Sequence, residues 1–256
     1  MKEFKIRCSS IYKIMGSMKK STLTDKQVIE LKELEDKRVS KGVEDLSDLD
    51  SEERYALTEK QNEKRLSLIE KRDRKPEISS GAKSYCEEWL MSNLVGYKKE
   101  VKSKYLEKGL ACEDDAILLL NPDYRKNEER RESNYLSGEC DILLDDKVID
   151  IKCSWDFSTF PKLKEVIPDE AYIWQVQGYM ILENKPKAEV SYCLMNTPEH
   201  LDDRCLDYSH LPRELRIKTF YFERDESAYE QIIEAVELCR EYIEELKYKF
   251  DLREVF

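Results

Sequence analysis

The amino-acid sequence predicts an α/β (α+β) fold, with a mixed central sheet flanked by helices and a charged helical hairpin inserted at 25–74. Three observations lead to this prediction. Short apolar runs, partly β-branched or aromatic, are typical of strands and occupy 142–144, 147–153, 188–195 and 217–222. Longer stretches repeat apolar residues at helical spacing. The segment 25–74 differs in composition, because charged residues dominate it and it holds no proline.

The N-terminal part predicts a short helix and then a projecting arm. Ile11, Ile14 and Met15 recur at helical spacing, and we expect Ser9 or Ser10 to cap this helix. In 25–74 the apolar residues form a thin stripe, which favours two helices with a turn near 45–51. We interpret this segment as an inserted arm for partners or oligomers. Its stripe comprises Val28, Leu31, Leu34, Leu66 and Ile69.

A helix carrying Tyr85, Trp89 and Leu90 precedes a basic run at 98–108. The run contains five lysines and two glutamates. It predicts either a nucleic-acid contact or an ordinary solvated helix face.

The next helix, over 106–120, places a carboxylate among apolar residues. Leu106, Leu110, Glu113, Ile117 and Leu120 step by four, three, four and three, so they share one face. A buried carboxylate must be paired, protonated or bound to a metal, since burying it bare is costly. The alternative is that Glu113 lies at the edge of the stripe and reaches solvent.

A β-hairpin is expected around Asp145-Asp146, with 129–137 as a strand leading into it. A two-residue turn would pair Leu144 with Lys147 and set Asp141 directly opposite Asp150. Their Cβ atoms would lie roughly 4.5–5.5 Å apart, where like charges are destabilising. A divalent cation would hold the two carboxylates together. The alternative is an exposed hairpin with ordinary surface charges.

The alternation of side chains along a strand sorts the hairpin residues into two faces. Lys152 follows Asp150 by two and points to the same face. Ile142, Ile149 and Ile151 then point to the other face, where they can join the core.

The C-terminal half predicts a helix, two strands and a last helix. The first helix starts at Pro168-Asp169-Glu170 and stops near 184–186. Gln175 and Tyr179 are four residues apart on one of its faces. Packing accounts for Tyr179 but poorly for a glutamine. Strands follow at 188–195 and 217–222, and the last helix shows an apolar face over 229–246.

Composition excludes several classes of protein. The 256 residues, 39% charged and 40% hydrophobic, can bury a sizeable core. No apolar run of about 18 residues and no apolar signal segment occur, so we expect an intracellular protein without a membrane span. Eight cysteines lack any Cys-x-x-Cys pair, which favours buried reduced thiols over zinc or iron–sulfur ligation. The net charge of −11 argues against nonspecific coating of nucleic acid, although a groove can still be basic.

The order of elements resembles the PD-(D/E)XK nuclease superfamily, and within it the phage lambda-type, or YqaJ-like, recombination exonucleases. The residues that carry the resemblance are Glu113 on a helix, Asp141, Asp150-Ile151-Lys152 and Gln175-x-x-x-Tyr179. The resemblance covers 98–195, which it implies is the catalytic core of a single nuclease domain spanning 1–256, and extends more weakly to 8–15. Two features depart from the usual pattern: Glu139-Cys140 replaces a proline before the first acid, and Asp150 replaces the commoner glutamate.

The resemblance implies Mg²⁺ or Mn²⁺ as cofactor, bound by Asp141, Asp150 and the Ile151 carbonyl. Glu113 would be a further ligand, directly or through water. By the same resemblance Lys152 positions or deprotonates the attacking water. Gln175 and Tyr179 orient Lys152 and the scissile strand.

The resemblance also implies how DNA and partners are engaged. Ser9 would contact a terminal 5′ phosphate, and lysines of the basic run would line the DNA path, namely Lys98, Lys99, Lys102 and Lys104. The implied partners are double-stranded DNA ends, a single-strand annealing protein and further copies of the chain in a homo-oligomeric ring, in phage or prophage recombination.

Three functions remain open from the sequence. The first is a metal-dependent exonuclease that degrades linear duplex DNA from an end, 5′ to 3′. The second keeps the fold but makes it a structure-specific or restriction-type endonuclease. The third is a non-catalytic, acidic helical adaptor whose nuclease-like core only scaffolds the arm.

Overall fold

The chain forms two compact units in a computed structural model. The structure describes residues 3–15, 23–39, 57–73, 77–97, 99, 102–202, 204 and 206–252. One unit combines Met1–Ser17 with Ser79–Phe256, and the other is Met18–Ile78. No described helix is long and apolar enough to cross a membrane. The seven cysteines in these described ranges are free thiols, and all but Cys153 are buried.

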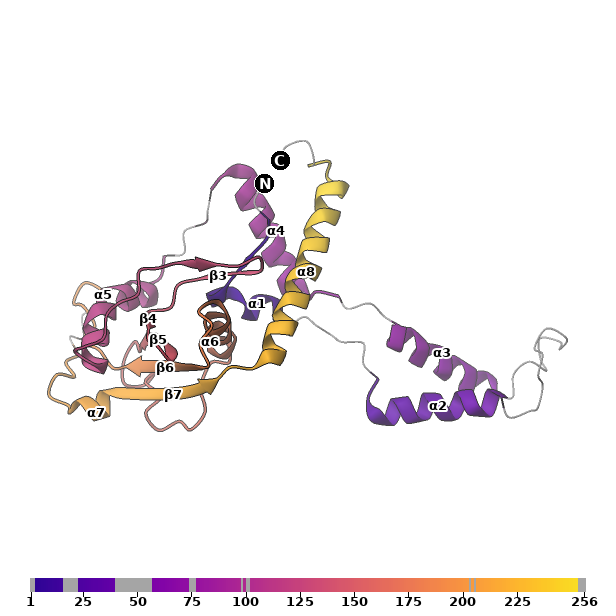
Figure 1. Cartoon of the computed structure of the whole chain (residues 1–256), viewed down its shortest axis with the longest axis horizontal. Coiled ribbons are helices and arrows are strands. Elements are labelled where there is room, and N and C mark those ends of the chain that lie inside the picture. The colour runs from indigo at the N-terminus through magenta and orange to yellow at the C-terminus, as the bar shows by residue number, and fades with distance from the viewer. Residues whose placement is uncertain are drawn as a thin grey trace. The chain divides into compact units, whose positions relative to one another are not determined.

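The smaller unit is the helical hairpin that the sequence predicts, with α2 at Asp25–Val39 and α3 at Glu59–Asp73 (Figure 1). The helices are antiparallel, because Gln27 contacts Lys71 near one end whereas Lys37 contacts Gln61 near the other. Each helix begins with a Thr-x-x-Gln capping box, at Thr24 and Thr58.

The core of this hairpin differs in part from the expected stripe. Leu31 and Leu34 are buried as predicted, together with Leu57 and Leu68. Val28 and Leu66 are exposed, so their inclusion in the stripe was wrong. A stripe of so few apolar residues does not define clearly which face of each helix is buried. The predicted turn at 45–51 lies outside the described residues.

The larger unit contains a four-stranded sheet in the order β4-β5-β6-β7. β5 runs parallel to β6 and antiparallel to β4, and β7 is antiparallel to β6, so the sheet is mixed as predicted. The strands span Ile142–Leu143, Lys147–Cys153, Lys187–Cys193 and Ile217–Glu223.

Two helices lie against opposite faces of this sheet. α5, Lys104–Leu120, packs Cys112, Ala116 and Ile117 against the face that carries Ile149 and Ile151. The α6 helix, Ala171–Leu182, lies against the other face, to which Asp150 and Lys152 point (Figure 1). The predicted sorting of the hairpin into an apolar and a polar face is confirmed.

A second, three-stranded sheet replaces the single strand expected over 129–137. Its order is β1-β3-β2, with strands at Ile6–Arg7, Leu136–Gly138 and Arg131–Glu132. Ser133 ends β2, because its hydroxyl accepts hydrogen bonds from the N–H groups of Tyr135 and Leu136 and closes a turn. The prediction of one continuous strand was wrong for this reason.

The remaining described helices of this unit pack on one another or precede a strand. The η1 turn spans Cys8–Ser10, and Ile11 rather than a serine directly precedes α1, Tyr12–Met15, so the prediction of a serine cap was wrong. The long α8, Glu226–Lys249, buries the apolar face predicted for it and packs against α4, Ser80–Val95. A short α7, Arg213–Arg216, precedes β7.

Candidate active site

The hairpin of β4 and β5 has the register that the sequence predicts. Ile142 pairs with Ile149 and Leu143 with Val148, and the Leu144 N–H donates to the Lys147 carbonyl across the turn. Continuing this register by one residue sets Asp141 opposite Asp150. The two acids therefore meet on the polar face of the hairpin.

Both carboxylates are held by donors within the chain. Asp150 is 1% exposed. Its Oδ2 lies 2.7 Å from Lys152 Nζ in an ion pair, and its Oδ1 accepts a hydrogen bond of 2.8 Å from Gln175 Nε2. Asp141 Oδ2 accepts a hydrogen bond of 2.5 Å from the N–H of Ile151.

Burial and mutual repulsion disfavour the ionised form of these acids. Burial, together with the charge of Asp150, raises the pKa of Asp141 to about 7. Burial also raises the pKa of Asp150, although Lys152 opposes this. Burial lowers the pKa of Lys152, but the Asp150 carboxylate outweighs it and the pKa lies above its ordinary value, so Lys152 is an ammonium ion. The site is a strained pair of acids beside one cation.

This arrangement predicts a pH dependence of stability in the presence of a chelator. Asp141 has a pKa of about 7 in the folded protein against 3.8 ordinarily, so between these values the folded chain keeps a proton that the unfolded chain has lost. The free energy of unfolding should therefore fall as the pH rises from 4 to 7, by up to about 1.4 kcal/mol per pH unit. Urea titrations should show this slope, and Asp141→Asn should make it shallower. Stability that rises across this window would contradict the assignment.

Gln175 and Tyr179 of α6 lie in the site, where Gln175 contacts Asp150 directly. The Gln175 amide donates to Asp150 and, at 3.0 Å, to the Tyr179 hydroxyl. Because Asp150 pairs with Lys152, Gln175 is linked to Lys152 through Asp150. That this pair of residues orients Lys152 and the scissile strand stays a prediction.

Tyr172 is a site residue that the sequence reasoning missed. The Lys152 ammonium lies 4.5 Å from the centre of its ring, a cation–π contact. Tyr172 precedes Gln175 by three residues on the same helical face, and this spacing was the available signal. Asp150 and Tyr172 together fix the position of Lys152.

Replacing Tyr172 should therefore change catalytic turnover more than substrate binding. Tyr172→Leu removes the π face. For the DNA hydrolysis that the sequence resemblance implies, we expect kcat to fall by about tenfold with little change in KM. Tyr172→Phe keeps the ring and should retain turnover near the wild-type value. Equal loss in both variants would show that the hydroxyl, not the ring, matters.

The Glu113 carboxylate is neither buried without a partner nor fully exposed to solvent. Its side chain is 19% exposed, and its Oε1 lies 3.0 Å from Lys126 Nζ. The apolar stripe expected around it is only partly right, because Ile117 is buried whereas Leu106 and Leu110 are exposed. The α5 helix buries the face of Lys108, Cys112 and Ala116 instead, since the sheet approaches it from that side.

The residues expected to contact DNA are mostly on the surface. Ser9, Lys99, Lys102 and Lys104 are exposed, and the Lys104 ammonium lies 4.6 Å from the Trp155 ring centre. Lys98 lies outside the described residues. Lys108, the last lysine of the basic run, is fully buried and donates to the carbonyls of Trp155 and Met195, so it cannot contact DNA.

The carboxylates fit a divalent cation by their chemistry. Within the described residues, no three His, Cys, Asp or Glu side chains form a complete metal-binding group. Asp141 and Asp150 nevertheless offer hard oxygen donors whose repulsion a cation would relieve. Asp150 Oδ2 is engaged by the Lys152 ammonium group at 2.7 Å, so that group would have to shift for a cation to bind this oxygen.

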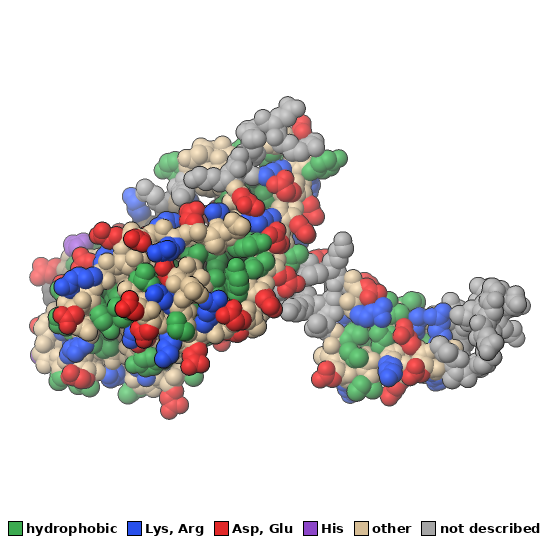
Figure 2. Space-filling model, in the orientation of Figure 1, with side chains coloured by type: hydrophobic (Ala, Val, Ile, Leu, Met, Phe, Trp, Pro, Cys, Tyr) green, Lys and Arg blue, Asp and Glu red, His purple; other side chains and the backbone are tan. Residues whose placement is uncertain are grey.

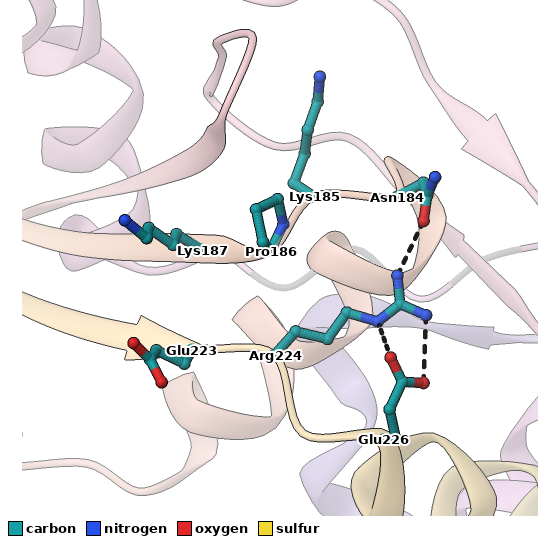
Figure 3. A pocket seen from close by; sticks show the side chains of 7 residues that line it. All are labelled: Asn184, Lys185, Pro186, Lys187, Glu223, Arg224 and Glu226. Atoms are coloured by element: carbon teal, nitrogen blue, oxygen red, sulfur yellow. Dashed lines mark hydrogen bonds and ion pairs between the residues drawn. The ribbon is translucent and has the colours of Figure 1, made fainter.

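The acids lie apart from a pocket at the other end of the sheet. A cavity of about 450 Å³ is lined by residues next to the start of β6 and the end of β7, among them Lys187 and Arg224. Figure 3 shows Arg224 neutralised by Glu226 and bound to Asn184. This pocket lacks converging catalytic groups.

Comparison with solved structures identifies the fold. A phage-related exonuclease from Haemophilus somnus 129PT matches with a TM-score of 0.68 and 27% identity, over 97% of each chain. This chain has the fold of the phage-related exonucleases. The predicted fold class and the resemblance to recombination exonucleases are thereby confirmed.

A second exonuclease shares this fold at lower identity. LHK-Exo, an alkaline exonuclease from Laribacter hongkongensis, matches with a TM-score of 0.56 and 16% identity, over 96% of this chain and 93% of that one. Its complex with dAMP matches with a TM-score of 0.52 and 21% identity, over 68% and 87% of the two chains. No protein-family model matches the sequence, and no curated protein matches it significantly.

Proposed function

We propose that this protein is a DNA exonuclease that hydrolyses linear duplex DNA from an end, 5′ to 3′, with Mg²⁺ or Mn²⁺ as cofactor. The observation that carries the proposal is the pair of facing acids, Asp141 and Asp150, beside Lys152 in the fold of the phage-related exonucleases. The crystal structure of LHK-Exo with dAMP, a nucleotide, supports a nucleic-acid substrate for this fold.

Each residue of the site has a role in phosphodiester hydrolysis. Asp141 and Asp150 would hold the divalent cation, with the Ile151 carbonyl and Glu113 as further ligands. When bound, the cation polarises the phosphoryl oxygen and supplies hydroxide near neutral pH. Gln175 keeps Asp150 in place through its amide.

Lys152 supplies a positive charge where negative charge develops on the phosphoryl oxygens. Asp150 and the Tyr172 ring already hold its ammonium group in one position, so little reorganisation is needed when DNA arrives. Lys152 would also orient or deprotonate the attacking water.

We propose that this protein processes DNA ends for recombination in a phage or prophage, with a single-strand annealing protein as partner. Figure 2 shows basic and acidic side chains interspersed over the visible face rather than one basic surface. A homo-oligomeric ring would let this acidic chain hold DNA, because a channel can be basic while the outside is acidic.

Digestion of defined DNA substrates tests the proposal. Linear duplexes labelled at the 5′ or the 3′ end should lose the 5′ label first, with Mg²⁺ or Mn²⁺ and not with EDTA. Covalently closed circles should stay intact. Cutting of closed circles would favour the endonuclease, and absence of both activity and a heat signal on Mg²⁺ titration would favour the adaptor.

A further inference from the structure

Lys126 forms a cationic contact at the edge of the site that the proposed mechanism does not use. It lies in the segment between α5 and β2, where its Nζ is 3.0 Å from Glu113 Oε1 and 3.8 Å from Asp114 Oδ1. The Lys126 side chain is 42% exposed, whereas that of Glu113 is 19% exposed. The ammonium group therefore covers Glu113 from the solvent side.

The segment that carries Lys126 is bonded directly to the backbone beside Asp141. The N–H of Asn127 donates to the Asp141 carbonyl at 2.8 Å, and Asn127 Nδ2 donates to the Cys140 carbonyl at 3.0 Å. These bonds fix the residue next to Lys126 to the strand that supplies the first acid. The contact of Lys126 with Glu113 is thus built into the site, unlike an ion pair between two unrestrained surface side chains.

We propose that Lys126 competes with the divalent cation for the Glu113 carboxylate. This inference rests on the proposed function, because it assigns Glu113 to the cation site. The Lys126 ammonium group occupies Oε1 of Glu113, and its charge repels a divalent cation that approaches either oxygen. The cation engages Glu113 only when the Lys126 side chain swings into solvent, which its exposure and flexible stem permit.

The competition sets the affinity of the site for metal. Removing a partner that supports a metal ligand lowers metal affinity by about 10- to 100-fold. Here the partner opposes binding and is partly exposed, so we expect its removal to tighten binding by about tenfold. Lys126 changes the metal affinity only through its contact with Glu113.

Mn²⁺ binding to the purified full-length protein without DNA tests the proposal, by electron paramagnetic resonance of free Mn²⁺ and by calorimetry. Lys126→Met should tighten binding about tenfold, and Lys126→Gln should act alike. Lys126→Arg keeps the charge and should bind as the wild type does. Lys164→Met removes an exposed lysine elsewhere and controls for net charge.

The Glu113→Gln background separates the possible outcomes. There, Lys126→Met should no longer tighten binding. Unchanged or weaker binding in both neutral Lys126 variants, or tightening that persists without Glu113, would overturn the competition. If the wild type binds no Mn²⁺, the proposed function falls together with the inference. If it binds Mn²⁺ through Asp150 but Lys126→Met has no effect, the inference alone falls.

Discussion

Asp150→Asn should reduce release of nucleotides from linear duplex DNA by about a hundredfold to a thousandfold. Asparagine keeps the shape of the side chain, and its Oδ1 can still accept the hydrogen bond from Gln175 Nε2. It removes the charge that would bind the cation and that pairs with Lys152. The chemistry should therefore be lost while the packing around position 150 is retained.

The same variant should remain folded at pH 8. Burial raises the pKa of Asp150, so its ionised form is less favourable in the folded chain than in the unfolded chain. A neutral side chain avoids this cost, which offsets part of the loss from leaving the Lys152 ammonium group without its carboxylate. Asp145→Asn, at the exposed tip of the same hairpin, serves as the matched control and should change neither property. Full activity in Asp150→Asn, or loss of activity only through unfolding, would refute the role of Asp150.

The sequence predicted the hairpin and its register because a two-residue turn leaves one pairing that keeps Ile142, Ile149 and Ile151 on the core face. A slip by one residue would have turned all three to the polar face. The facing of Asp141 and Asp150 follows from this single constraint. The fold class followed as well, since the strands and the long helices each carry a strong local pattern.

Features that depend on contacts between distant segments were not predictable in the same way. Helical spacing showed that Leu106, Leu110 and Glu113 share a face, but not that the sheet lies against Lys108 and Cys112 instead. The ion pair between Glu113 and Lys126 joins a helix to a loop, and no local sequence pattern predicts it. Tyr172 could have been predicted as a site residue, because its spacing from Gln175 places it on the same helical face.

The close packing around Cys8 is another contact that only the structure reveals. The Cys8 thiol lies between Gly138 of β3 and Gly178 of α6. A Cβ atom added at Gly138 would lie 2.7 Å from Cys8 Sγ and 2.9 Å from Tyr179 Cε1. Both neighbours are buried, and Tyr179 is tied through Gln175 to Asp150. Glycine at 138 thus lets the η1 turn and the active-site helix approach β3.

Gly138→Ala should therefore lower the free energy of unfolding by about 1–3 kcal/mol, the usual effect of overpacking a core. Urea unfolding measures it. Gly109→Ala is the matched control, because nothing lies within 4 Å of its added Cβ and it sits inside α5, where alanine should stabilise by roughly 0.5–1 kcal/mol.

A double-mutant cycle with Cys8→Ala locates the origin of the loss. Removing Sγ takes away the shortest contact, so Gly138→Ala should be less destabilising in that background than in the wild type. The remaining loss comes from the Tyr179 ring and from Cys8 Cβ, which would lie 3.2 Å from the added atom. Displacement of the ring should shift Gln175 and Asp150 and lower nuclease activity. Equal losses in both backgrounds would show that the glycine is needed for its backbone rather than for the space it leaves to Cys8.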